Sequence, residues 1–197
     1  MKKIFALWLC VLLLCGFGPA AEAAYEASTD YMLCMMEAAV SGDVAAGLAA
    51  QHSRDAKIEA EGLSYASVDF EELLLLAKII YAEAGSEWLS DEWKMAVGEV
   101  ALNRVASPEF PDTLREVIHQ PGQYYSESNR YFKNLKPSLR CVQLALRLLE
   151  GERVLHEPSV VFQANFVLGS GVHLKLVDSQ LGATYLCYSS KPELYNN

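Results

Sequence analysis

The stretch SVDFEELLLLAKIIYAEAG, residues 67–85, predicts a helix that is apolar on nearly all of its sides. Asp69 is a candidate N-cap with Glu72 three residues later, as in a capping box, and Gly85 is a natural residue to end the helix. A helix without a polar face belongs in the centre of a domain rather than on its surface. The sequence therefore predicts a central buried helix around which the rest of a domain packs.

The segments that follow predict further helices and then a small sheet. Three helices are expected from their periodicity and end signals: one after Ser90, one over 112–122 capped by Asp112, and one from Pro137, at a first helical position, to Gly151. The polar and aromatic segment between the last two is expected to be a loop. The pattern then changes to that of strands, over residues 159–169, 171–177 and 183–189. Helices first and an antiparallel sheet last predict an α+β domain.

The first 23 residues have the layout of a secretory signal peptide, with a basic start, an apolar run over residues 4–15 and the small-residue site Ala21-Glu22-Ala23. An uncleaved membrane anchor and a lipoprotein modified at Cys15 are the alternatives. We expect an exported protein, not stably inserted in a membrane once the signal is cleaved. Residues 24–66 are expected to be a helical or linker extension, and residues 67–197 the functional domain.

The charge and the cysteines narrow the possible functions and partners. The net charge is −9, so the chain is not expected to bind nucleic acid through phosphate contacts. After signal cleavage three cysteines remain, Cys34, Cys141 and Cys187. A disulfide between Cys141 and Cys187 and three free thiols are both compatible with this number. The four histidines form no local metal-binding motif, and no metal or cofactor is expected.

Glu83 is the candidate catalytic residue. It lies in the final turn of the buried helix, where the unsatisfied carbonyl groups carry a partial negative charge. That field and burial both disfavour the ionised carboxylate, so both are expected to raise the pKa of Glu83. A glutamic acid that stays protonated near neutral pH is suited to donate a proton to a leaving group, as in glycoside cleavage.

Several segments in order resemble the SleB-type cell wall hydrolases, the family of spore cortex-lytic enzymes and their vegetative relatives. They are LLAKIIYAEAGSE (75–87), VGEVALNRVASPEFPDTLREVIHQPGQY (97–124) and LGATYLCY (181–188). The family often has an arginine after YAEA that is missing here. The resemblance implies a lysozyme-like fold, germination- or wall-related lysis, and cleavage of peptidoglycan glycan strands between N-acetylmuramic acid and N-acetylglucosamine.

The resemblance also implies lytic transglycosylase chemistry, with Glu83 as the single general acid and base. A zinc-dependent N-acetylmuramoyl-L-alanine amidase and a non-catalytic wall-binding protein are the alternative functions. The sequence leaves open whether the substrate is spore cortex or vegetative wall, and it identifies no protein partner.

The candidate substrate-binding residues are polar or aromatic side chains near the matching segments. They are Glu87, Asn103, Gln123, Tyr124 and Asn165. Glu87 is expected to support Glu83 rather than to be a second acid. Arg104 falls in the apolar stripe of the second helix. A buried guanidinium would need Glu83, Glu87 or helix-end carbonyl groups as partners, and the alternative is that the side chain extends from the last helical turn to solvent.

Overall fold

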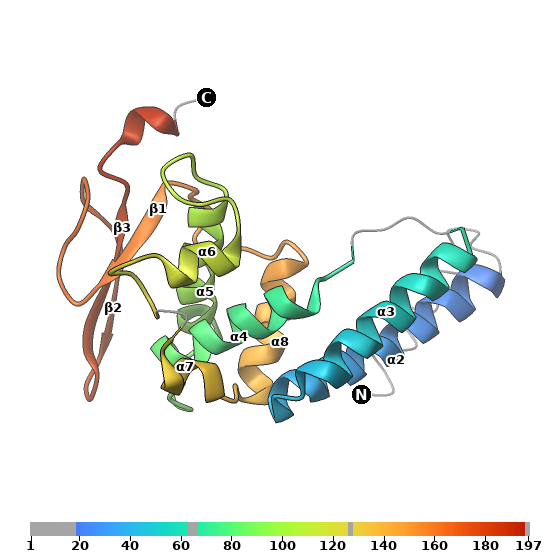
Figure 1. The fold of residues 1–197 in the computed structure, drawn as a ribbon. Coiled ribbons are helices and arrows are strands. Elements are labelled where there is room, and N and C mark those ends of the chain that lie inside the picture. Colours follow the sequence, from blue (N-terminus) through green and yellow to red (C-terminus); the bar gives the residue numbers. More distant parts are fainter. Residues whose placement is uncertain (1–18, 63–66, 126–127, 196–197) are drawn as a thin grey trace. The chain divides into compact units, whose positions relative to one another are not determined.

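The computed structural model describes residues 19–62, 67–125 and 128–195 (Figure 1). The chain divides into two compact units. The first comprises residues 1–38 and 43–67, and the second comprises residues 39–42 and 68–197.

The N-terminal part is helical. Helix α2 spans Pro19–Ser41 and α3 spans Val44–Ala60, so the described part of the extension predicted as helical or linker is helical. Asp43 caps α3, because its carboxylate accepts a hydrogen bond from the Ala46 amide at 3.0 Å. Most of the predicted signal peptide lies outside the described residues. None of the helices described in the structure has both the length and the apolar character needed to cross a membrane.

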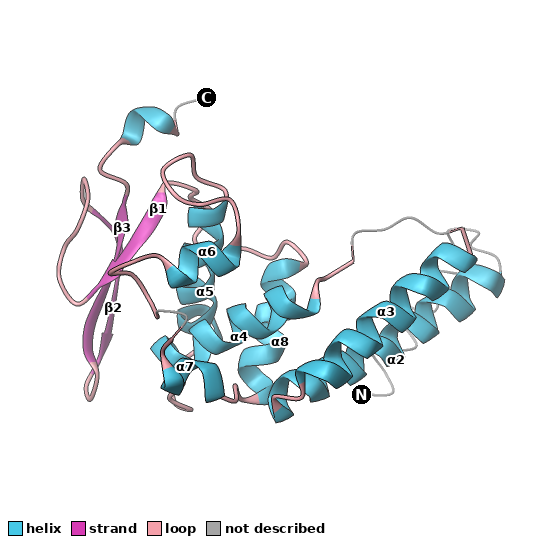
Figure 2. Cartoon of the chain, viewed as in Figure 1, coloured by secondary structure: helices cyan, strands magenta, loops and turns pink. Residues whose placement is uncertain are grey.

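The described residues of the second unit form five α-helices, one sheet and a short 3-10 helix. The helices are α4 (Phe70–Ala84), α5 (Asp91–Val105), α6 (Leu114–His119), α7 (Arg130–Asn134) and α8 (Leu139–Leu149). The strands are β1 (Val160–Ala164), β2 (Val172–Asp178) and β3 (Gly182–Tyr188), followed by η1 (Pro192–Leu194). All pairings are antiparallel in the order β1-β3-β2, and Figure 2 shows the strands gathered on one side of the helices of this unit.

The predicted α+β class and the central buried helix are confirmed. Helix α4 packs against α5, α6 and α8, and its residues Leu73, Leu76, Ile79 and Ile80 have no exposed surface. The Asp69 carboxylate accepts a hydrogen bond from the Glu72 amide at 3.0 Å, as the capping pattern predicts.

Several element ends differ from the prediction. Thr113, not Asp112, caps α6, and Ser138 caps α8, so Pro137 lies before that helix rather than at its first position. The segment predicted to be a loop contains α7, which Asn129 caps. Strand β1 ends at Ala164, earlier than expected, so Asn165 lies in the bend that follows.

Gly85 ends α4 for a reason other than the predicted one. Its φ of −69° is right-handed, so the position does not need the left-handed freedom of glycine. A Cβ atom at this position would lie 2.3 Å from the Tyr81 carbonyl oxygen. Close approach of the chain to the last turn of α4 therefore favours glycine here.

Candidate active site

Glu83 projects from the last turn of the buried helix α4. The helix places it directly before Ala84, which is 1% exposed, while the Glu83 side chain itself is exposed. The pKa of Glu83 is raised, chiefly because surrounding protein desolvates the carboxyl group. The group is thus open to a ligand and still biased toward its protonated form.

The hydroxyl group of Tyr125 forms a hydrogen bond with Glu83. This bond lowers the pKa of Glu83 and so opposes part of the desolvation effect. Desolvation, followed by the charge of Glu83, raises the pKa of Tyr125 to about 12. Tyr125 therefore keeps its proton at neutral pH, and its hydroxyl group donates to the Glu83 carboxylate.

Contacts with α6 and α7 hold Tyr125 in place. Its backbone amide donates to the Ile118 carbonyl at 3.1 Å, and Nδ1 of His119 donates to the Tyr125 carbonyl at 2.7 Å. Its ring stacks on Phe132 with a centroid distance of 4.8 Å and an interplanar angle of 6°. The two short helices thereby fix the ring that reaches Glu83.

Lys94 binds the C-terminal end of α4. This lysine of α5 is 1% exposed, and its ammonium group donates to the Ala84 carbonyl and, at 2.8 Å, to the Ser86 carbonyl. Desolvation lowers the pKa of Lys94. One of the helix-end carbonyl groups predicted to raise the pKa of Glu83, that of Ala84, is thus bound to a cation, which offsets its field. Desolvation is the largest cause of the raised pKa.

Arg104 joins α5 to β1 and to the loop before Tyr125. Its Nε donates to the Val161 carbonyl at 2.6 Å, and its NH1 donates to Gln123 Oε1 at 2.8 Å. The guanidinium group lies 5.0 Å from the ring centroids of both Phe110 and Tyr124. Arg104 is buried and does not extend to solvent, but the expected partners Glu83, Glu87 and helix-end carbonyls are wrong. Its partners are a strand carbonyl and the amide of Gln123.

Residues 90–170 match the family model Cell Wall Hydrolase. The matched segment runs from the start of α5 past β1, so it includes Lys94, Arg104 and Tyr125 but begins after Glu83. The similarity supports an enzyme that acts on peptidoglycan. Comparisons with curated proteins and with solved structures found no match.

Three buried polar atoms of the matched segment have no hydrogen-bond partner among the described residues. They are the Tyr124 hydroxyl oxygen and the Oε1 atoms of Gln120 and Gln163. The pKa of Tyr124 is raised by desolvation and further by the charge of Glu83, while Arg104 lowers it. The Tyr124 hydroxyl is thus close enough to Glu83 for the charge of Glu83 to affect its pKa.

Glu87 and Glu83 face different neighbours. Glu87 is exposed, its carbonyl accepts from Arg140 NH1 at 2.7 Å, and its charge acts on Lys94 and Cys141. The charge of Glu83 acts instead on the two tyrosines. None of these interactions brings Glu87 into contact with Glu83. The supporting role of Glu87 stays a prediction.

Asn103 and Asn165 lie in different environments, the first buried and the second exposed. Asn103 is 7% exposed, and its amide group donates to the Glu157 carbonyl at 3.1 Å and the Val160 carbonyl at 3.0 Å. This amide therefore anchors the start of β1. Asn165 is exposed in the bend after β1. Sugar binding by either residue stays a prediction.

The cysteines and the metal-binding residue types form no further site in the described part of the chain. Cys34, Cys141 and Cys187 are all free thiols, and the latter two are buried. No group of three or more His, Cys, Asp or Glu side chains there is arranged to hold a metal ion.

Sequence reasoning missed Lys94 and favoured Tyr124 over Tyr125 as the functional tyrosine. Lysine is seldom buried, so the sequence does not predict that Lys94 is buried and binds the end of α4. Tyr124 and Tyr125 follow the same Pro-Gly turn. Only the hydrogen bond between Tyr125 and Glu83 distinguishes the two, and it is a contact between segments far apart in the sequence.

Proposed function

We propose that this protein is an exported, SleB-type lytic transglycosylase that cleaves peptidoglycan between N-acetylmuramic acid and N-acetylglucosamine. The observation that carries the proposal is the accessible Glu83 carboxyl group with its raised pKa, at the end of the buried helix α4. The similarity of residues 90–170 to cell wall hydrolases supports the substrate class.

Glu83 would act first as an acid and then as a base. Its proton passes to the glycosidic oxygen as the bond to the muramoyl carbon breaks. The resulting carboxylate then takes the proton of the muramoyl C6 hydroxyl, whose oxygen closes an anhydro ring in place of water. One carboxyl group suffices for both steps, unlike the pair used in ordinary glycoside hydrolysis.

Neighbouring groups support these steps. The Tyr125 hydroxyl donates to Glu83, and this stabilises the carboxylate formed after the first proton transfer. Arg104 fixes the loop that carries Gln123 and Tyr124, which keeps these groups in position for the substrate.

Digestion of purified wall material by the wild type, Glu83→Gln and Glu87→Gln tests the proposal. We expect the wild type to release anhydromuropeptides, Glu83→Gln to lose at least about 100-fold in rate, and Glu87→Gln to keep most activity. Glu87→Gln is a matched control because it makes the same change four residues further along the chain. Mass spectrometry of the products is the measurement.

The alternatives give other products. A zinc amidase would release stem peptides, leave glycan bonds intact and be inhibited by a chelator. A wall-binding protein would bind the material without releasing fragments. Equal loss in the two glutamine variants would contradict a single acid and base. Comparing spore cortex with vegetative wall in the same assay identifies the preferred substrate.

A further inference from the structure

Trp88 is a large aromatic side chain that is exposed near Glu83 in the chain. It is 57% exposed and lies in the segment between α4 and α5. Its Cα is at most about 18 Å from that of Glu83, because five residues separate the two. Tryptophan is usually well buried, so an exposed one beside a candidate catalytic residue requires an explanation.

The backbone on both sides of Trp88 is fixed. Arg140 NH1 donates to the Glu87 carbonyl at 2.7 Å, and Arg140 NH2 donates to the Leu89 carbonyl at 3.0 Å. Arg140 is itself held by Asp91, at 2.7 Å from Nε. Leu89 is 4% exposed and anchors the segment in the core. Trp88 is thus presented from a rigid part of the chain.

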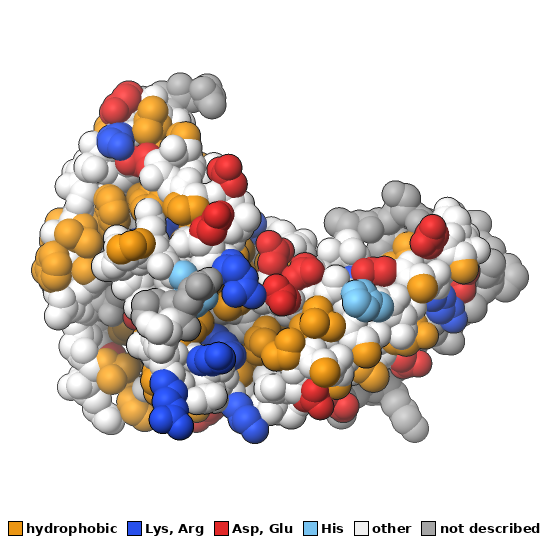
Figure 3. Space-filling model, viewed as in Figure 1, with side chains coloured by type: hydrophobic (Ala, Val, Ile, Leu, Met, Phe, Trp, Pro, Cys, Tyr) orange, Lys and Arg blue, Asp and Glu red, His pale blue; other side chains and the backbone are white. Residues whose placement is uncertain are grey.

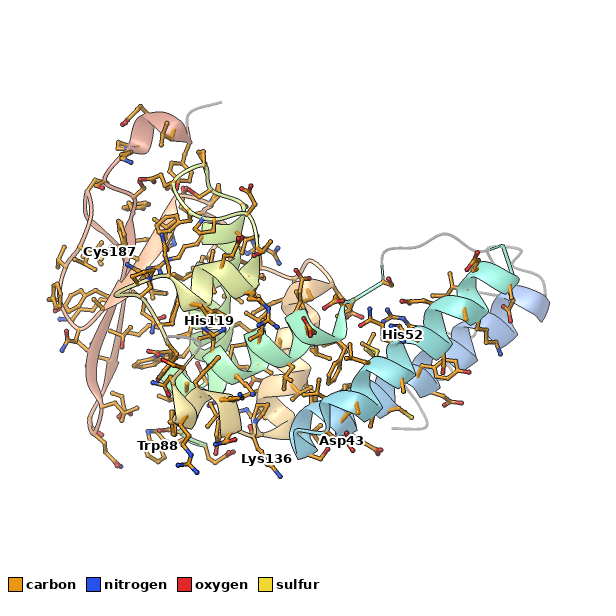
Figure 4. The ribbon with its side chains drawn as sticks, viewed as in Figure 1. Asp43, His52, Trp88, His119, Lys136 and Cys187 are labelled. Carbon is orange, nitrogen blue, oxygen red and sulfur yellow. The ribbon has the colours of Figure 1, made fainter. Side chains whose placement is uncertain are left out.

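The edge of the indole ring is also held. Asp178, at the turn between β2 and β3, accepts hydrogen bonds from the Leu181 and Gln180 amides at 2.9 Å each. These bonds lower the pKa of Asp178, and a hydrogen bond from the Trp88 side chain acts in the same direction. The turn therefore keeps a charged acceptor for the indole N–H. Figure 4 shows Trp88 at the edge of the helices of the second unit.

Exposed apolar side chains are also present on the sheet of this unit (Figure 3). Val177 in β2 is 67% exposed, and Phe166 after β1 is 59% exposed. For Val177 and Phe166, the described contacts include none comparable to those that Arg140 and Asp178 make around Trp88. The restraint on Trp88 distinguishes it from these other exposed side chains.

We propose that Trp88 is a stacking platform for a sugar ring of the glycan strand, at a position beyond the glycosidic bond whose oxygen Glu83 protonates. Sugar rings present C–H faces that pack on aromatic faces, and a ring that is already oriented loses little entropy when a ligand binds. The inference rests on the proposed function for the nature of its ligand. It adds a second point of contact along the strand, which favours polymeric over short substrates.

Binding measured without cleavage tests the platform. In a Glu83→Gln background, soluble peptide-free glycan of alternating N-acetylglucosamine and N-acetylmuramic acid is titrated and followed by tryptophan fluorescence and calorimetry. Trp88→Ala is expected to weaken binding roughly 10-fold, the size of effect that loss of one stacked ring has in other polymer-binding proteins. Trp88→Phe is expected to stay within about threefold of the parent, because it keeps an aromatic face.

Leu33→Ala is the control, since it truncates an exposed apolar side chain, 52% exposed, in the other unit, and it should leave the affinity unchanged. Unchanged affinity in Trp88→Ala would overturn the inference. So would a folded Trp88→Phe protein as weak as Trp88→Ala, because the indole N–H rather than the ring face would then be responsible. Failure of the wild type to cleave wall material would reject the proposed reaction, and the binding result would still decide the role of Trp88.

Discussion

The carboxyl group of Glu83 is subject to two opposing effects. Desolvation raises its pKa, and the hydrogen bond from Tyr125 lowers it, with a net rise. A pure acid would benefit from desolvation alone, but a group that must also act as a base needs its carboxylate stabilised after the proton has left. The tyrosine supplies that stabilisation, so the pair suits a carboxyl group used in both directions.

Replacing Tyr125 with phenylalanine separates these effects. Without the hydroxyl group the carboxylate loses a donor, so the pKa of Glu83 rises further and the protonated form persists to higher pH. The high-pH limb of kcat/KM on solubilised glycan is expected to move upward, and kcat is expected to fall about 10-fold or more because the second step loses its stabilised base.

Tyr131→Phe is the matched control for that measurement. Tyr131 is 59% exposed, and its ring lies 6.2 Å from that of Tyr125. Tyr125, and not Tyr131, forms the hydrogen bond that lowers the pKa of Glu83. The pH profile of Tyr131→Phe should therefore match that of the wild type. A high-pH limb that moves downward in Tyr125→Phe would show that the tyrosine does not stabilise the carboxylate.

The C-terminal end of helix α4 is bound by a lysine of the next helix, α5. Lys94 of α5 binds the Ala84 carbonyl, one of the groups that a helix end leaves unsatisfied, and the Ser86 carbonyl just beyond the helix. The same contact sets where the last turn of α4 lies on α5, and this turn carries Glu83. The element that positions the acid is therefore secured from outside by one buried ammonium group.

Replacing Lys94 with methionine keeps much of the side-chain volume and removes the charge. We expect a loss of about 1–3 kcal/mol in the free energy of unfolding, because buried carbonyl groups are left unpaired. The high-pH limb of activity should also move upward, since the helix-end field then acts on Glu83 unopposed. Urea unfolding and a pH–rate profile measure the two effects. Lys133→Met, at an exposed side chain, should change neither.

Local patterns predicted the helices well and their contacts poorly. Asp69 caps its helix as expected, because an N-cap depends on residues within one turn, and the next helix begins after Ser90 as expected. Helix α7 was missed because its five residues are too short for a periodic pattern to develop. Thr113 was missed because its neighbour Asp112 is an equally good capping residue by type.

Across the whole second unit, the candidate site depends on contacts between distant segments. Glu83 was predicted because its own helix carries the signal of buried apolar neighbours. The sequence did not predict the roles of Tyr125 and Lys94 or the partners of Arg104. Each of these contacts joins different elements, so no fixed spacing in the sequence indicates it. The sequence thus pointed to Glu83 as the candidate acid, and the fold was needed to find the groups that adjust its pKa and hold its helix.

A second long-range network ties the C-terminal segment to the loop after α5. Glu109, whose side chain is 7% exposed, accepts from the Tyr195 hydroxyl at 2.9 Å and from the Ser189 hydroxyl, and it lies 3.5 Å from the Lys191 ammonium group. Desolvation alone would raise the pKa of Glu109, but the donors from Ser189, Tyr195 and Lys191 together lower it. The network joins the end of β3 to the helices.

Glu109→Gln is therefore expected to lower the free energy of unfolding by about 1 kcal/mol at pH 7, since the charged acceptor is lost. A carboxyl group with a lowered folded-state pKa stabilises the fold above its unfolded pKa, so this contribution disappears as the pH falls through the folded-state value. Urea unfolding at pH 7 and about pH 3 should show a smaller difference at the lower pH. Glu193→Gln, at an exposed position in η1, should have no effect at either pH. An equal loss for Glu109→Gln at both values would show that shape, and not the ionised carboxylate, holds the C-terminal segment.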